Sequence, residues 1–409
     1  MTLKPISALA IAIPLAFALS ACQPASDSPA NDAAAEDSAV EAGVEAARSV
    51  ATDRKSKAQM QTEFNQALAA AGTTSGPGAP AMWKLSDEDT EIYLFGTVHL
   101  LRPDLVWRTA EFDQAISSAD KIVFEVDMKS EDAIRAVTTD YFQRGMFADG
   151  RTLTSVLNEE DEAVVSAAVD TLGVPISAMN TFEPWMASVN LVGLKLTNDG
   201  FDPASGGESV IEAEAVAAGK SFGYLETISQ QTDAFDLLPE EEQITMLYET
   251  AVLLDESPQM LDLLVEEWAD GDVTGIGTLV ANPDGVGFTD AAYQSLLVKR
   301  NQNWVPQIEA MRDSPGSIFI AVGAGHLAGP DSVVTMLRDK GYTIEGPYGS
   351  LPSQSTIQSS ICSTSSGSNN ESSLSVRPMM DAPRLWIRVL SPLIRWCQSG
   401  NGLPSWISR

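Results

Sequence analysis

The chain has 409 residues, of which 44% are hydrophobic and 20% charged, so it holds enough apolar side chains for one large core or two small ones. Its formal net charge of −31 repels phosphate backbones and argues against nucleic acid as a partner. The three cysteines, Cys22, Cys362 and Cys397, are too few for a disulfide framework or a cysteine-rich zinc site. Any chemistry that requires imidazole must use one or both of the two histidines, His99 and His326.

The first 21 residues have the pattern of a secretory signal. Lys4 precedes an apolar run from Ile6 to Leu19, which is shorter than the ~20 residues that span a bilayer. The run ends in Leu-Ser-Ala-Cys22, which resembles a bacterial lipobox, so we expect Cys22 to be acylated after removal of residues 1–21. Gln23 resembles the residue that permits transfer to the outer membrane, on its periplasmic side. The alternative is an ordinary secretion signal with an incidental cysteine.

Residues 22–80 are rich in Ala, Asp, Glu, Ser, Gly and Pro, which is typical of a disordered tether. Within this segment, Val44–Ala71 has the composition of a loose helix, which the glycines from Gly72 onward should end. We therefore expect the folded domain to span residues 82–349.

Short β-rich runs alternate with helical patterns across residues 82–349. The expected strands are Glu91–Phe95, Lys121–Val126, Ser221–Leu225, Ser317–Val322 and Tyr342–Glu345. The expected helices are Arg108–Ser118, Glu131–Arg144, Glu159–Leu172, Glu208–Ala218, Pro239–Leu254, Pro258–Ala269, Ala291–Arg312 and Pro330–Lys340, the last with Pro330 in its first position and Gly341 after its end. This alternation predicts an α/β fold, in which helices cover a mixed, mostly parallel sheet and the helical stretches around 141–197 and 239–312 are insertions or a helical half.

Residues 350–409 differ from the rest of the chain. Ser355–Ser375 consists almost entirely of small polar residues, and the remainder carries more positive than negative charge. We expect a low-complexity, disordered tail; the alternative for Leu385–Cys397 is a short amphipathic helix on a membrane surface.

The two histidines occupy the same sequence pattern. A β-rich run leads into Gly96-Thr-Val-His99, and a second leads into Gly323-Ala-Gly-His326. Glu125 and Glu226 each follow another expected strand. Because ligands of α/β sheets bind at the carboxyl ends of the strands, parallel strands would gather both imidazoles and both carboxylates at one edge.

Two imidazoles and one or two carboxylates suit a catalytic divalent metal such as Mn, Co, Zn or Fe. Such an ion lowers the pKa of a water molecule, and a spare Glu can act as general base. The alternatives are a His acid/base pair without metal, or histidines that only cap and pack. The repetition of one Gly-x-x-His pattern at every histidine favours a functional site.

Several ordered motifs resemble the TraB/PrgY/GumN family, which includes the TIKI metalloproteases. Besides the two Gly-x-x-His motifs, they are Phe124-Glu-Val-Asp127, Gly207-Glu208, Tyr224-Leu-Glu-Thr227, Gln230-Gln231, Arg300-Asn-Gln-Asn-Trp304 and Gly325-His-Leu-x-Gly329. The resemblance covers about residues 82–349 and implies the mixed α/β fold of the erythromycin-esterase/ChaN-like superfamily.

The resemblance also implies roles for individual residues. His99 and His326 would be metal ligands, and Glu125 a ligand or base. Glu208 and Glu226 are further candidates for the same metal shell. Arg300 and Asn301 would bind a peptide or protein substrate or stabilise an oxyanion, although Arg300 could instead pair with a core carboxylate. Trp304 and Trp185 are interpreted as core or cleft-wall aromatics.

These observations leave four functional hypotheses. The first is a metal-dependent, peptidase-like hydrolase of the cell envelope. The second is a metal-independent esterase-like hydrolase that uses a His and a Glu, and the third is a non-enzymatic, ChaN-like lipoprotein that binds haem or iron. The fourth, an envelope scaffold, is disfavoured because both histidines and Glu125 are intact.

Overall fold

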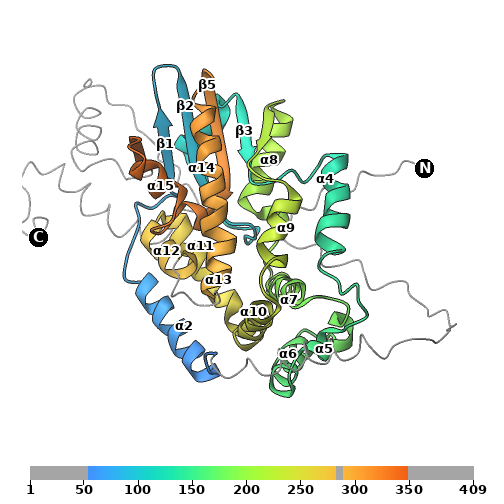
Figure 1. The fold of residues 1–409 in the computed structure, drawn as a ribbon. Helices are drawn as coiled ribbons and strands as arrows, with labels where there is room; N and C mark the ends of the chain where they lie inside the picture. The colour runs from blue at the N-terminus through green and yellow to red at the C-terminus, as the bar shows by residue number, and fades with distance from the viewer. Residues whose placement is uncertain (1–53, 282–288, 349–409) are drawn as a thin grey trace, which may run out of the picture. The chain divides into compact units, whose positions relative to one another are not determined.

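The computed structural model describes residues 54–281 and 289–348, which form a six-stranded sheet with helices on both faces (Figure 1). The expected signal peptide with Cys22, the first part of the expected tether and the whole expected tail lie outside the described residues. Among the helices of the described residues, none has the length and apolar character of a membrane span.

The sheet is mixed and mostly parallel, as the sequence predicts. Its strands are β1 Met82–Ser86, β2 Thr90–Thr97, β3 Lys121–Phe124, β4 Ser221–Tyr224, β5 Gly316–Gly323 and β6 Ile344–Tyr348. They lie in the order β4-β3-β5-β2-β1-β6, and β1 runs antiparallel to both of its neighbours. The first four strands of that order are parallel, so their carboxyl ends share one edge. The sequence predicted five of these strands and missed β1, a five-residue segment with Lys84 at its centre.

Helices make up most of the remaining described chain. They are α2 Lys57–Ala71, α3 Ala110–Ser118, α4 Glu131–Ala136, α5 Leu153–Val156, α6 Glu159–Thr171, α7 Pro184–Asn198, α8 Gly207–Ala217, α9 Ile228–Asp236, α10 Glu240–Val252, α11 Ser257–Asp270, α12 Val273–Val280, α13 Asp290–Tyr293, α14 Lys299–Met311 and α15 Val333–Asp339. Two π-helical turns, Val137–Phe142 and Gln294–Val298, continue α4 and precede α14.

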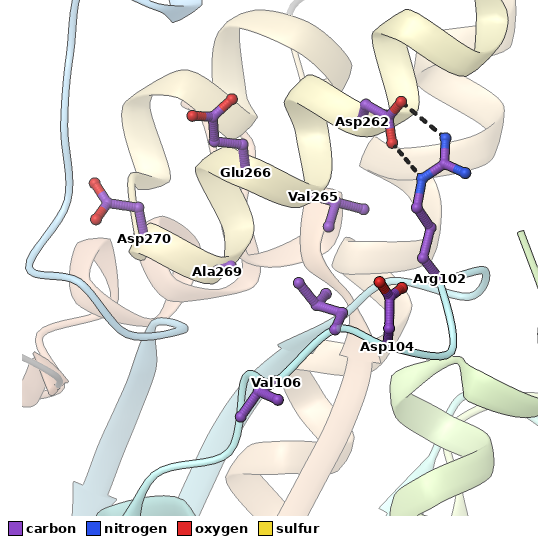
Figure 2. A pocket seen from close by; sticks show the side chains of 9 residues that line it. Arg102, Asp104, Val106, Asp262, Val265, Glu266, Ala269 and Asp270 are labelled. Atoms are coloured by element: carbon purple, nitrogen blue, oxygen red, sulfur yellow. Dashed lines mark hydrogen bonds and ion pairs between the residues drawn. The ribbon is translucent and has the colours of Figure 1, made fainter. Parts of the chain in front are cut away.

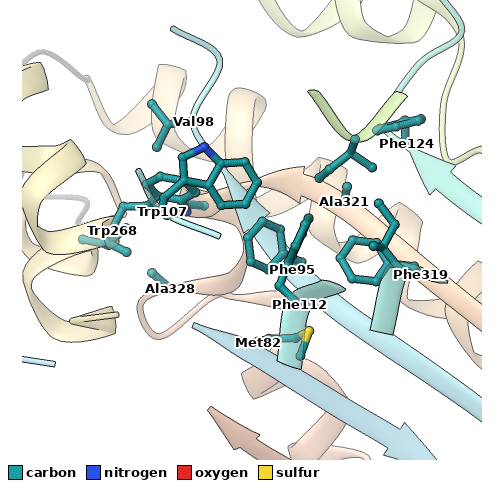
Figure 3. Close-up of a cluster of buried hydrophobic side chains, with 14 of the residues drawn as sticks. Met82, Phe95, Val98, Trp107, Phe112, Phe124, Trp268, Phe319, Ala321 and Ala328 are labelled. Carbon is teal, nitrogen blue, oxygen red and sulfur yellow. The ribbon is translucent and has the colours of Figure 1, made fainter. Parts of the chain in front are cut away.

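Alternation along the strands divides the core into two layers. Phe95 and Phe319 project to the face covered by α3 and α11, where their rings pack with those of Trp107, Phe112 and Trp268 (Figure 3). Apolar side chains of the same strands project to the opposite face, where α14 and α15 cover them. Both faces of the central strands are therefore buried, which explains why β2 and β5 are almost continuously apolar.

A separate helical layer packs around α10, as the predicted insertions suggested. Helices α5, α6 and α7 bury Leu153, Val165 and Leu191 against Leu247 of α10. Helix α2, at the position of the expected loose helix, buries Met60 and Phe64 against the end of α10, and Ser56 caps it. The described fold therefore starts before Met82, because this amphipathic helix has an apolar surface to cover.

The last helix differs in detail from its prediction. Helix α15 begins at Val333 rather than at Pro330, because the Ser332 side chain accepts the Thr335 N–H and so caps the helix there. Gly341 follows the end of the helix with φ 93°, as the glycine predicted.

Glu267 of α11 is a buried acid beside a second buried acid, Asp272, and each is about 5% exposed or less. Asp272 caps α12 by accepting the N–H groups of Thr274 and Gly275 through Oδ1, each at 2.9 Å. Its Oδ2 is buried with no partner in the described part of the chain. Burial, followed by the charge of Asp272, raises the pKa of Glu267 to about 7. A proton on Glu267 supplies the donor for a hydrogen bond to Asp272.

We expect Glu267→Gln to stabilise the protein at pH 8 and to change its stability little at pH 4.5. The pKa of folded Glu267 lies above its ordinary value of 4.5, so wild-type stability falls as pH rises from about 4.5 to about 7 and the proton is lost. Glutamine keeps a donor and does not titrate, so its advantage should grow across that window to roughly 1–3 kcal/mol. Urea unfolding at the two pH values measures the difference.

Glu88→Gln, which alters an exposed carboxylate in the turn between β1 and β2, is the matched control and should not reproduce the gain in stability at pH 8. If Glu267→Gln were no more stable than wild type at pH 8, Glu267 would not hold its proton in the folded protein.

Candidate functional site

The two Gly-x-x-His turns leave the sheet side by side. Strands β2 and β5 pair in parallel, with Gly96 opposite Val322 and Thr97 opposite Gly323, so both turns begin at the same level. Glu125 follows β3, on the other side of β5, and Glu226 follows β4 beyond it. Four neighbouring carboxyl ends therefore supply the two imidazoles and two carboxylates that the sequence pattern singled out.

The glycines of both motifs are required by close packing. A Cβ on Gly96 would lie 3.0 Å from the Cα of Ala324, the residue that opens the second turn. A Cβ on Gly323 would lie 3.3 Å from Glu125 Oε1, 3.6 Å from His326 Cδ2 and 3.7 Å from His99 Nε2. Three of the predicted site residues thus surround one point beside Gly323, and a side chain there would fill the space between them.

His99 forms an ion pair with Glu208. Its Nδ1 lies 2.8 Å from Glu208 Oε1, which also accepts the Thr97 hydroxyl. Glu208 stands in the first turn of α8, which is held against the His99 turn because Gly207 N–H donates to Val98 O at 3.0 Å. The Glu208 charge raises the pKa of His99 to about 9. Since 49% of the His99 side chain is exposed, solvent screens part of this attraction.

His326 is buried and has a different environment. Asn301 donates from Nδ2 to the Asp331 carbonyl, so its Oδ1 faces His326 Nδ1 at 2.6 Å and accepts the ring proton there. The unprotonated Nε2 then accepts an N–H of Arg300, with 3.1 Å between Nε2 and Nη1. Burial, followed by the charge of Arg300, lowers the pKa of His326 to about 3. His326 is therefore neutral at physiological pH.

Glu125 and Glu226 are neighbouring buried carboxylates with opposite pKa shifts. Glu125 accepts the Gly323 N–H at 2.7 Å and Arg300 Nη2 at 2.6 Å. Burial alone would raise the pKa of Glu125, but the charge of Arg300, followed by the two histidines and the Gly323 N–H, outweighs burial and lowers that pKa to about 2. For Glu226, burial outweighs Arg300 and raises the pKa above its ordinary value. The pair therefore keeps Glu125 ionised while Glu226 binds a proton more readily.

One face of α14 holds these groups in place. Arg300 bonds to Glu125 and Glu226, Asn301 orients His326, and the Trp304 indole donates to Glu226 Oε2 at 3.2 Å. The Trp304 ring also packs on the His326 ring, with 4.3 Å between centroids. The π-helical turn before α14 places the Leu296 carbonyl 3.0 Å from Arg300 Nη1.

The structure adds contacts that the sequence did not show. Asn301, expected to bind substrate, is 1% exposed, and its side chain contacts the Asp331 carbonyl and His326. Arg300 pairs with core carboxylates, which the sequence left as its alternative role. Trp304 lies in the core and also donates to Glu226. Thr97, which donates to Glu208, was not singled out from the sequence. Gln231, which donates to Glu125 and Glu226 at 3.3 Å each, was visible in the sequence as part of a motif without a role. Trp185 is a core residue, as expected.

A hollow of about 690 Å³ lies elsewhere, between the loop after His99 and helix α11 (Figure 2). The Arg102–Asp262 ion pair crosses one side of it, and Val106, 90% exposed, stands on the loop wall. None of the clustered site residues lines this hollow.

Comparison with known proteins identifies the fold family. Residues 81–346 match the sequence profile of the TraB/PrgY/gumN family. The chain belongs to this family. It is 23% identical over 272 residues to an uncharacterized protein of Treponema pallidum (strain Nichols), covering 63% of this chain and 80% of that protein. It is also 21% identical over 246 residues to the uncharacterized protein YbaP of Escherichia coli (strain K12), covering 60% of this chain and 87% of YbaP. No solved structure is significantly similar to the chain.

In this TraB/PrgY/gumN member, the two histidines should titrate very differently. We expect His99 to titrate above 6.5 because of Glu208, and His326 to stay neutral from pH 5 to pH 9. With two histidines in the chain, the ring carbon signals of chelator-treated protein measured by NMR over that range report both.

Glu208→Gln should lower the pKa of His99. Glu212 lies on the same helix as Glu208 and pairs with Lys129. The control Glu212→Gln should therefore leave the pKa of His99 unchanged. A His326 signal that titrates near 6.5 would contradict the buried network.

Proposed function

We propose that the chain is a hydrolase whose centre is formed by His99, Glu125 and His326 and takes a divalent metal ion, Mn, Co, Zn or Fe. One observation carries this proposal. Each imidazole has its Nδ1 held by an oxygen acceptor, Glu208 or Asn301, while its Nε2 is directed to the space beside Glu125. That is the arrangement in which metal-ligating histidines are usually held, because the outer acceptor orients the ring and increases its basicity.

The donor set fits such an ion, but its present positions are not closed around one. His326 Nε2 lies 3.9 Å from Glu125 Oε1, and His99 Nε2 and Glu125 Oε1 border the same point beside Gly323. In the described part of the chain, no group of three or more His, Cys, Asp or Glu residues is close enough together to hold an ion as it stands. Arg300 lies against two of the donors. Binding therefore requires a local rearrangement rather than new residues.

The exposure and charge of each residue suit it to a different role in the proposed centre. A bound divalent ion would polarise a substrate carbonyl and make a water molecule more acidic. Glu125 remains ionised and His326 remains neutral, so both are in the state that a ligand requires. The half-exposed His99 marks the side from which substrate and water reach the centre. Because Glu208 raises the pKa of His99, its Nε2 carries a proton near neutral pH; a bound ion would displace that proton, while Glu208 keeps the one on Nδ1.

A peptide or protein substrate is supported by the resemblance to metalloprotease members of the family. The buried cluster supports an enzyme over a scaffold, because ionisable groups with shifted pKa values gather at functional sites more often than elsewhere. The relatives' names carry no activity, so the substrate class rests on the resemblance alone.

A metal-independent hydrolase is the second candidate, and the Arg300–His326 hydrogen bond favours it. In that arrangement the His99–Glu208 pair would be the acid/base group, and Arg300 would supply positive charge to an oxyanion. Because Glu208 raises the pKa of His99, a base role would make the rate increase with pH above neutrality, and chelators would have no effect.

Metal analysis of the purified protein tests the first candidate. We expect wild type to hold near-stoichiometric Mn, Co, Zn or Fe, and His99→Ala, His326→Ala to hold almost none. Glu249→Gln, which alters a buried acid of α10 outside the site, is the matched control and should keep its metal. Equal metal content in wild type and the double variant would discard the metal site, and a Soret band would instead support the haem-binding alternative.

We further propose that the protein is an outer-membrane lipoprotein, on the strength of Leu-Ser-Ala-Cys22 after the apolar run. We expect wild type to fractionate with membranes and to incorporate an acyl label, and Cys22→Ser to lose both properties. Cys362→Ser is the control and should behave as wild type. Wild-type protein without label in the soluble periplasmic fraction would contradict the anchor.

A further inference from the structure

Arg300 saturates all of its donors inside the site. Its Nε donates to both oxygens of Glu226 at 3.1 Å, and its Nη2 donates to Glu125 and Glu226. Its Nη1 donates to the Leu296 carbonyl and to His326 Nε2. The guanidinium has five N–H groups, and this set occupies all of them in a side chain that is 12% exposed. Arg300 is therefore engaged by the groups of the centre itself and has no N–H left for a substrate.

The groups that Arg300 occupies are those that a metal ion would need. The Nε2 atom of His326 has one lone pair, so it cannot accept Arg300 Nη1 and bind an ion at the same time. Glu125 likewise directs Oε2 to Arg300 at 2.6 Å. A divalent ion beside an unmoved guanidinium would also place two positive centres close together in a buried site. Occupation by Arg300 and occupation by metal are thus mutually exclusive at His326.

The contacts of Arg300 to Glu226 differ from its contacts to Glu125 and His326. Glu226 holds Arg300 through both Nε and Nη2 and is itself held by Trp304 and Gln231. A change in the outer torsion angles of Arg300 can withdraw Nη1 from His326 while the Nε contact to Glu226 persists. Glu226 therefore provides an anchor about which the guanidinium can turn.

We propose that Arg300 is a built-in competitor of the metal ion, which closes the metal-free centre by binding Glu125 and His326 and turns away on Glu226 when a divalent ion enters. This inference rests on the proposed metal centre and adds a determinant of its affinity. Arg300 compensates the buried carboxylates when no ion is present, and it weakens metal binding by the free energy of the contacts that must be given up. It is a positioning residue that sets metal affinity.

Calorimetric titration of the chelator-treated full-length protein with Zn²⁺ and with Mn²⁺ at pH 7 tests the proposal. We expect Arg300→Met to bind at least one of the two ions with a Kd at least tenfold lower than wild type, because the competitor is gone and the apolar stem is kept. The metal-free variant should unfold at a lower temperature than wild type, and added metal should raise its Tm by more than it raises that of wild type.

Arg144→Met is the matched control. Arg144 also bonds two carboxylates, Asp233 and Asp236, from a partly buried position, but it contacts none of the predicted metal donors. Its loss should lower the Tm without changing the Kd for metal. Arg300→Lys keeps the charge but cannot span three groups from one ammonium, so it should bind metal several-fold more tightly than wild type even if Arg300→Met does not fold.

The outcomes separate the two proposals. If Arg300→Met and Arg300→Lys bind metal no more tightly than wild type, while His326→Ala abolishes binding, the metal centre stands and the competitor role falls. If neither wild type nor any Arg300 variant binds metal, the metal centre itself falls, and the competitor role falls with it.

Discussion

The pairing of Arg300 with two buried carboxylates is the interaction on which the arrangement of the site depends. Glu125 and Glu226 follow adjacent parallel strands, so the sheet brings their charges together away from solvent. Without a nearby cation, one or both would be expected to take up a proton or draw water into the core. The guanidinium compensates both and bonds to His326, so it couples three strand ends to α14.

The rest of the fold supplies the rigidity that this coupling needs. Strands β2 and β5 are buried on both faces, and the indole of Trp268 donates to the Gly96 carbonyl at 2.7 Å, at the start of the first Gly-x-x-His turn. On the other face, Trp304 joins the apolar layer under α14 and donates to Glu226. The aromatic core and the polar cluster thus share side chains, and repacking the core would move the site.

The cluster has two environments within a short distance. His99 and Glu208 border solvent, where a charged imidazole is tolerated, whereas His326 is enclosed by Trp304 and Asn301 and stays neutral. Chemically similar residues therefore have different protonation states because of burial and their partners. This asymmetry distinguishes a solvent-exposed side, at His99, from an interior that holds charge in fixed positions.

The sequence by itself determined the fold class, five of the six strands, and the placing of His99, His326, Glu125 and Glu226 at neighbouring strand ends. It could do so because strand periodicity and glycine turns are local signals, and because residues after parallel strands must meet at one edge. The sequence did not predict β1, because this short strand carries little local signal and is stabilised by pairing with β2 and β6.

Only the tertiary structure decided what these groups do to one another. Arg300 lies 175 residues after Glu125, and Asn301 lies 25 residues before His326. No sequence spacing shows that Arg300 pairs with a carboxylate or that Asn301 orients an imidazole. Protonation states follow from burial and from hydrogen-bond partners across such distances. The pKa of each group is set only once the four strand ends and α14 have come together, because the electrostatic field at that group is the sum of contributions from all five elements.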